Sequence, residues 1–103
     1  MLLSKANLYN EADQKVSFFA GALTHPARLR ILRTLRDEGP KTVFDISLEH
    51  PLSLPAVSQH LEILRERKVI DFKPQYPYLI YSLNEEVYEE ARKSLAGFFI
   101  QDL

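Results

Sequence analysis

Hydrophobic and polar residues between Leu52 and Arg65 follow one another with the period of an amphipathic α-helix. The apolar stripe consists of Leu54, Val57, Leu61 and Leu64. Ser53 is expected to cap the helix by accepting a backbone N–H. Pro55 is tolerated in the first turn because its missing N–H would be unpaired there. The pattern therefore predicts a helix over about 53–67 with one buried face.

Three more helices are predicted before this one, over about 10–23, from Thr24 to Gly39, and over about 42–49. Thr24 and Thr42 are the expected N-caps of the second and third. The apolar stripe of the first helix consists of Ala12, Val16, Phe19, Ala20 and Leu23, and the apolar side of the second consists of Leu29, Ile31, Leu32 and Leu35. In the third, Val43, Phe44 and Ile46 are expected to face inward. A short helix, a turn and the helix over 53–67 come in succession, which is the order of a helix-turn-helix.

After this helix the pattern changes to β-branched and aromatic residues with partial alternation, which predicts strands over about 69–73 and 78–83. Pro74 and Pro77 lie between them and belong at a turn or an edge, because proline cannot donate to a strand ladder. Asn84 is expected to cap a last helix over 85–100. The chain is therefore predicted to be one domain over 1–103, mainly α with a small β-hairpin. Its architecture would be a winged helix-turn-helix of about five helices plus a two-stranded wing.

Composition narrows the possible functions. The 103 residues include three histidines and no cysteine, which excludes disulfides and thiolate metal sites. No apolar run approaches the roughly 20 residues that span a bilayer, and no signal-peptide pattern is present. A cytoplasmic protein without a membrane partner is therefore expected. The net charge is −1, but residues 25–73 carry nine basic and seven acidic side chains, so a weak positive excess surrounds the helix over 53–67.

Three stretches of the chain, taken in order, resemble the ArsR family of bacterial winged-helix transcriptional regulators. They are LTHPARLRIL at 23–32, SLPAVSQHLEILR at 53–65 and YLIYSL at 78–83. The resemblance implies a homodimer joined by the helices over 10–23 and 85–100. Such a dimer would bind an inverted-repeat operator in double-stranded DNA and repress transcription until a signal relieves it. The resemblance does not identify an inducer. It also implies a structural role for Arg28, which aligns with an arginine typical of the family.

The expected DNA contacts lie on the polar face of the helix over 53–67 and on the wing. They are Ser53, Pro55, Ala56, Ser58, Gln59 and His60 on the helix, and Lys73 and Tyr76 on the wing. Gln59 can form two hydrogen bonds with adenine, and Ser58 or His60 can donate to a phosphate or a base edge. Tyr76 can hydrogen-bond a phosphate. The alternatives are a solvated helix face and a purely structural hairpin.

Metal sensing is the best-known property of the family, and its ligand sets do not match this chain. The thiolate sensors need cysteines, which are absent here. Other sensors use histidines and carboxylates on the last helix, which here has Glu85, Glu86, Glu89 and Glu90 but no histidine. The sequence therefore predicts no metal site and no cofactor. It also contains no nucleophile elbow or phosphate loop, so no enzyme is expected.

Two alternatives stay open. A winged-helix module for protein–protein interaction, without DNA, is favoured by the near-neutral charge, the weakly basic wing and the exposed carboxylate of Glu62. The apolar residues of the last helix either form a symmetric dimer with the helix over 10–23 or complete the domain's own core. These residues are Val87, Tyr88, Ala91, Leu95, Phe98 and Phe99.

Overall fold

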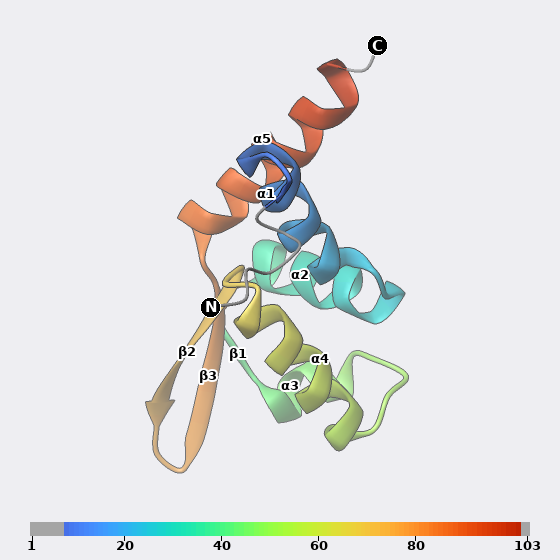
Figure 1. The fold of residues 1–103 in the computed structure, drawn as a ribbon. Helices are drawn as coiled ribbons and strands as arrows, with labels where there is room; N and C mark the ends of the chain where they lie inside the picture. The colour runs from blue at the N-terminus through green and yellow to red at the C-terminus, as the bar shows by residue number, and fades with distance from the viewer. Residues whose placement is uncertain (1–7, 102–103) are drawn as a thin grey trace, which may run out of the picture.

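The computed structural model describes residues 8–101, which form five α-helices, one 3-10 turn and a three-stranded antiparallel sheet. In chain order the elements are α1 (Glu11–Ala20), η2 (Gly21–Leu23), α2 (Pro26–Glu38), β1 (Lys41–Thr42), α3 (Val43–Leu48), α4 (Leu54–Glu66), β2 (Ile70–Gln75), β3 (Tyr78–Leu83) and α5 (Glu85–Gln101). The mainly helical, winged helix-turn-helix architecture is confirmed (Figure 1). Residues 1–7, 102 and 103 of the proposed domain lie outside the described residues.

Short polar side chains begin most of the helices, as the sequence predicts. The side chains of Thr42 and Asn84 accept hydrogen bonds from backbone N–H groups at 3.0 and 3.1 Å, and Ser53 accepts at 3.4 Å. The prediction for Thr24 is wrong, because α2 is capped one residue later by Nδ1 of His25, which accepts from the Ala27 N–H at 3.0 Å. The Thr24 hydroxyl is engaged elsewhere, because it donates to the carbonyl of Gly21 at 3.2 Å and accepts from Arg28 at 2.6 Å.

The core forms around α4. Val57, Leu61 and Leu64 are completely buried. Leu54 is 44% exposed, which contradicts its predicted burial. It begins the helix at the edge of the molecule, between the exposed residues Ser53 and Pro55, one turn beyond the last core contact.

The prediction for Phe44 is also wrong. Its side chain is 56% exposed, whereas Ile46 in the same short helix is completely buried. Residues two apart in a helix diverge by about 200°, so α3 can bury only one of the two. The inner face of α3 is therefore fixed by Ile46.

The sheet has the order β1-β3-β2. β1 pairs only Lys41 and Thr42 with β3, and the sequence analysis missed it because two residues carry no detectable period. β2 begins one residue later and ends two residues later than predicted, since its pairing with β3 continues to Gln75 opposite Tyr78. Pro74 lies within this strand and is tolerated because β2 is at the edge of the sheet. The wing is thus a long hairpin with a two-residue tip.

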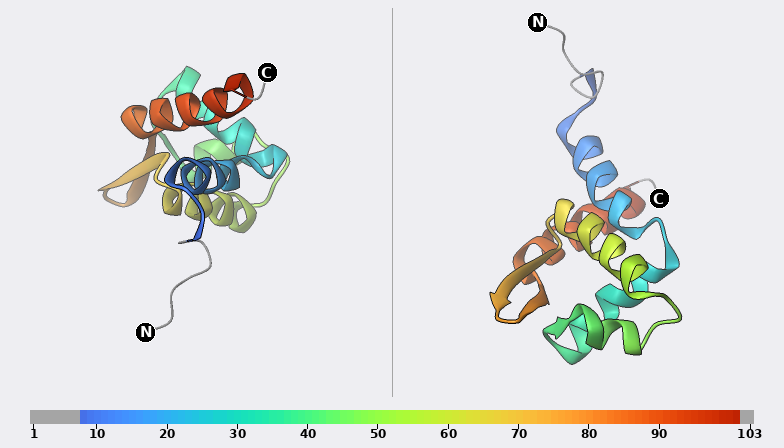
Figure 2. Two further views of the ribbon diagram at one scale, coloured as in Figure 1. Left: turned by 45° about the horizontal axis from the view of Figure 1, so that its top comes forward. Right: turned by 90° about the horizontal axis from the view of Figure 1, so that it is seen from below.

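The two ends of the molecule differ in structure. α1 lies against α5 (Figure 2), and the C-terminal half of α5 extends beyond the other helices (Figure 1). The wing and the α3–α4 pair lie at the opposite end (Figure 1). Across the described range, no helix combines the length and apolarity that a membrane crossing requires.

We predict that Gly39→Ala destabilises the protein by about 1–3 kcal/mol, because Gly39 has φ 86° and ψ −167°, a conformation nearly restricted to glycine. A Cβ at Gly39 would contact no atom within 4 Å, so the loss would come from the backbone alone. Urea unfolding measures it. Gly97→Ala is the control, since this helical glycine also has open space. It should gain about 0.5–1 kcal/mol. Equal effects of the two changes would contradict the prediction.

Candidate nucleic-acid interface

Two side-chain hydrogen bonds fix the turn between α3 and α4, one from His50 within the turn and one from Arg30 on α2. Nδ1 of the buried His50 lies 2.6 Å from the carbonyl oxygen of Ile46, so this nitrogen carries the proton and donates. The guanidinium of Arg30 on α2 donates to the carbonyl of Glu49. These contacts fix the turn of the helix-turn-helix relative to α2, and with it the direction in which α4 leaves the turn.

The solvent face of α4 carries small and polar side chains. Because Val57, Leu61 and Leu64 face inward, Ser58 and Gln59 are exposed. Pro55 is exposed and Ala56 is half-buried at the first turn. Ser53 is exposed, and its hydroxyl oxygen is already used as the cap of α4. The structure thus brings together five of the six helix residues predicted from the sequence on an accessible surface.

His60, the sixth, lies at the boundary between α4 and α2. Its Nδ1 is 3.0 Å from a guanidinium nitrogen of Arg28, which is only 8% exposed and also donates to the Thr24 hydroxyl at 2.6 Å. The His60 ring packs against the ring of His25 at a tilt of 47°, with 4.4 Å between ring centroids. The expected structural role of Arg28 is therefore seen directly, as a buried tie between α2 and α4.

These contacts determine the protonation of His60. A guanidinium only donates, so Nδ1 of His60 must accept and the ring proton must lie on Nε2. Burial lowers the pKa of His60 below its ordinary value of 6.5, and the neighbouring His25 and Arg28 lower it further. His60 is therefore neutral at pH 7 and has a single N–H left to offer a ligand.

Glu62 is exposed on α4 but its charge is compensated. Arg65, one turn later, donates to both carboxylate oxygens, and this contact lowers the pKa of Glu62. The central carbon of the Arg65 guanidinium lies 5.4 Å from the ring centroid of Phe72 on β2, a cation–π contact. Glu62 thus pairs with Arg65, and Arg65 in turn connects the end of α4 to the wing.

Arg67 connects the C-terminal end of α4 to α1, and the sequence analysis did not identify this tie. Its guanidinium donates to the carbonyl of Phe18 at 3.1 Å and lies over the Phe18 ring. Gly21 makes the contact possible, since a Cβ there would lie 2.6 Å from the guanidinium. The only signal in the sequence is a glycine at the end of an amphipathic stretch, which does not indicate a partner 46 residues later.

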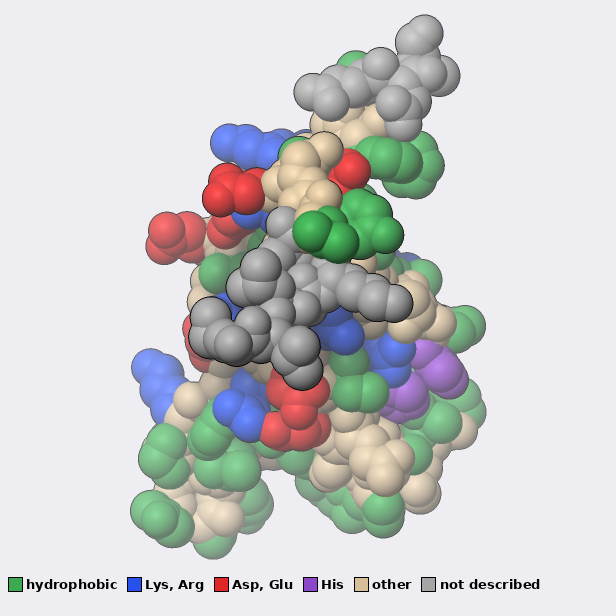
Figure 3. Space-filling model, viewed as in Figure 1, with side chains coloured by type: hydrophobic (Ala, Val, Ile, Leu, Met, Phe, Trp, Pro, Cys, Tyr) green, Lys and Arg blue, Asp and Glu red, His purple; other side chains and the backbone are tan. Residues whose placement is uncertain are grey.

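The wing presents aromatic rather than basic side chains. Tyr76 at the tip is 93% exposed and Tyr78 57% exposed, and Lys73 lies exposed on β2. Figure 3 shows this tip, at the lower left, as apolar side chains and backbone without Lys or Arg. The structure places both predicted wing residues, Lys73 and Tyr76, at the surface. They lie on the hairpin and not on α4, so the predicted contacts belong to two separate elements.

The described residues do not fit the metal sites of the family. No three His, Asp or Glu side chains within residues 8–101 come close enough to hold an ion. Nδ1 of His25 and Nδ1 of His60 are both occupied by hydrogen bonds, and His50 is buried against Ile46.

Comparison with known proteins identifies the family. The family model described as bacterial regulatory protein, arsR family, matches residues 25–71. The transcriptional repressor SdpR from Bacillus subtilis (strain 168) is 32% identical over 77 residues, which cover 75% of this chain and 84% of the repressor. This chain belongs to the ArsR family of bacterial regulatory proteins.

A second relative and a solved structure are also similar to this chain. The HTH-type transcriptional regulator Rv2034 from Mycobacterium tuberculosis is 30% identical, over 80% of this chain and 76% of that protein. HlyU from Vibrio cholerae N16961 superposes with a TM-score of 0.71 at 26% identity, covering 82% of this chain and 91% of that chain. The family is one of transcriptional regulators and not of enzymes.

We predict that protonation of His60 destabilises the fold. Since its pKa is lowered in the folded state, the unfolded chain binds the proton more tightly, and stability falls as the pH drops below about 6.5. His60→Asn retains an acceptor for Arg28 but does not titrate, so this variant should lose less stability between pH 7 and pH 5. Urea unfolding across this range measures the difference. An NMR titration midpoint for His60 at or above 6.5 would contradict the prediction.

Proposed function

We propose that this ArsR-family protein is a homodimeric transcriptional repressor that reads its operator with α4 and has no metal site. The observation that carries the proposal is the fixed exposure of Ser58 and Gln59 on a helix whose opposite face is completely buried. An exposed face of small and hydrogen-bonding residues is what a helix needs to enter the major groove. The name of the relative SdpR, a transcriptional repressor, supports the direction of regulation.

The roles of the individual residues follow from their geometry. Gln59 would form two hydrogen bonds with an adenine, and Ser58 would donate to a base edge or a phosphate. Nε2–H of His60 would donate to a phosphate, because Nδ1 is held by Arg28. Ser53, Pro55 and Ala56 would permit close approach of the first turn. Lys73 and Tyr76 would contact the backbone beside the groove.

Dimerisation would use the helices predicted over 10–23 and 85–100, which correspond to α1 with η2 and to α5. Phe99 and Ile100 are 67% and 68% exposed, and Phe98 is 42% exposed. Tyr9, next to α1, is 65% exposed. A cluster of large apolar side chains on a helix that extends beyond the domain is typical of a surface covered by a second copy. A two-fold dimer would place two α4 helices in successive major grooves, roughly 34 Å apart.

We predict that Gln59→Ala weakens specific operator binding by about 1–3 kcal/mol and relaxes the base preference at one position, since a bidentate contact would be lost. Fluorescence anisotropy with single-position operator variants measures both effects. Gln14→Ala on α1 makes the same change outside α4 and the wing and should leave the base preference unaltered. The variants are compared at equal dimer fraction, because Gln14 donates to the Tyr9 carbonyl beside the proposed dimer contact. An unchanged operator profile for Gln59→Ala would remove Gln59 from the reading role.

Salt dependence separates the repressor from the alternative function. Phosphate contacts release counterions, so affinity should fall by about tenfold or more between about 50 and about 200 mM salt. The aromatic wing tip, with Tyr76, Tyr78 and the 43% exposed Leu79, favours the alternative of a protein-binding module. Absence of DNA binding even at low salt would leave that module as the function.

We predict that Phe99→Asp weakens the dimer by at least about tenfold, because it places a charge in the apolar contact. Sedimentation velocity over a concentration series measures the change. Phe44→Asp is the matched control, since Phe44 is similarly exposed but lies on α3 at the other end of the molecule. If both variants sediment like the wild type, the dimer contact is not at the end of α5.

A further inference from the structure

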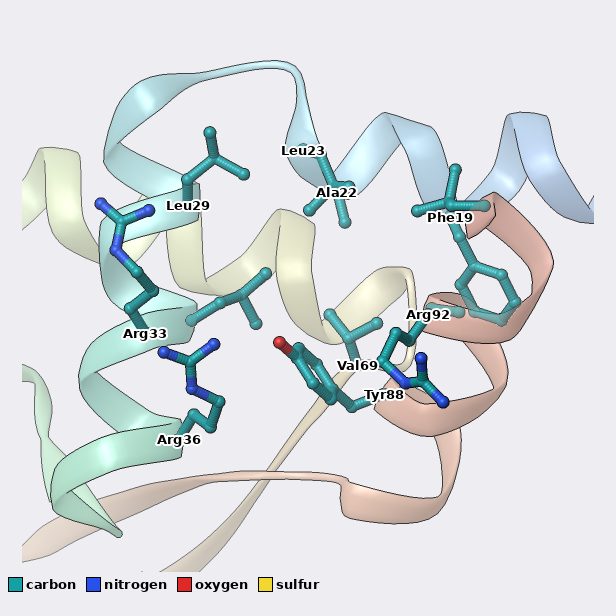
Figure 4. Close-up of a pocket in the computed structure, with 12 residues that line it drawn as sticks. Phe19, Ala22, Leu23, Leu29, Arg33, Arg36, Val69, Tyr88 and Arg92 are labelled. Atoms are coloured by element: carbon teal, nitrogen blue, oxygen red, sulfur yellow. The ribbon is translucent and has the colours of Figure 1, made fainter. Parts of the chain in front are cut away.

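A cavity of about 340 Å³ lies between the end of α1, α2 and the first half of α5, away from the exposed face of α4 (Figure 4). This volume is at the small end of the range of about 300–1,000 Å³ that is usual for ligand sites. Its floor is apolar and deeply buried, with Phe19, Ala22 and Val69 each at most 5% exposed. A ligand that displaced water from this floor would need an apolar body.

The rim of the cavity is cationic. Arg33 and Arg36 lie on the α2 side and Arg92 on the α5 side, and the hydroxyl of Tyr88 is directed toward α2 (Figure 4). None of the lining residues is acidic. An apolar floor below a rim of arginines matches a molecule with an apolar body and an anionic group.

Two of the three rim arginines form ion pairs, and the third does not. Arg36 donates to both oxygens of the adjacent Asp37, at 2.8 and 3.1 Å. Arg92 donates to Glu89 one turn earlier, at 2.8 and 2.5 Å. Within residues 8–101, Arg33 has no ion-pair partner. A guanidinium without an ion-pair partner favours a single negative charge, and a planar carboxylate matches the fork of an arginine.

We propose that this cavity binds a small monocarboxylate, whose apolar chain or ring lies on the Phe19–Ala22–Val69 floor and whose carboxylate is bound by Arg33. A dianionic phosphate is disfavoured, because the apolar floor cannot compensate a second charge that has lost its water. A neutral apolar molecule would form no charge-assisted hydrogen bond with the arginines of the rim. The site goes beyond the proposed function, and its occupancy can be measured without DNA.

Octanoate, below its micelle concentration, is a suitable probe for the full chain, and 1-octanol is its neutral counterpart. Isothermal titration and ¹⁵N NMR should show that octanoate binds and that the shifted amides include Ala22, Leu29 and Ala91 around the cavity. Octanol should bind at least about tenfold more weakly, because it cannot form charge-assisted hydrogen bonds with Arg33.

Arg33→Gln should weaken octanoate binding by about tenfold, whereas Arg30→Gln, the same change on the same helix outside the cavity, should not. Leu29→Trp, at the partly exposed mouth, should also reduce binding by filling the space. Equal affinity for octanol, or no effect of Arg33→Gln, would overturn the proposal. The proposal would also be overturned if the wild-type protein did not bind octanoate and the Arg33→Gln variant sedimented differently from the wild type. The cavity would then be an interface between copies of the chain.

Discussion

The burial of Val57, Leu61 and Leu64 is the constraint on which the rest of the structure depends. Each is completely buried, and full burial of such a side chain contributes about 1.5–3 kcal/mol. Successive helical residues are rotated by about 100°, so anchoring this stripe also fixes the direction of every other side chain of α4. The exposure of Ser58 and Gln59 is a geometric consequence of the buried face. The core and the proposed reading surface are therefore two sides of one packing arrangement.

Arginines then fix the position of α4 against its neighbours. Arg28 binds it to α2 through His60, Arg65 connects it to the wing through Phe72, and Arg67 connects it to α1 through Phe18. These guanidiniums account for much of the positive excess that the sequence places around α4. They act within the protein and not as free phosphate ligands. The charge count thus overstates the basic character of the surface. Under the proposed function, shape and hydrogen bonding at α4 would carry a larger share of DNA recognition.

The sequence was sufficient for features that depend on local period or local capping. All five helices, the hairpin and the caps Thr42, Ser53 and Asn84 were predicted, because each is determined within a few residues. The failures have tertiary causes. Leu54 and Phe44 fit an apolar pattern but lie where no neighbouring element covers them. In the candidate site, the exposed face of α4 followed from the period, whereas the environment of His60 depends on a residue 32 positions earlier.

The last helix shows how one element serves two surfaces. Tyr88, Ala91 and Leu95 of α5 border the cavity, while residues 98–100 expose apolar side chains beyond the domain. The same cavity is bordered by α2, which holds His60 and the turn before α4, and by Val69, directly before the wing. A molecule in the cavity would therefore contact the proposed dimer helices and the supports of the reading unit together. A change in their relative angle would alter the separation of two α4 helices in a dimer, and successive major grooves accept only a narrow range of separations.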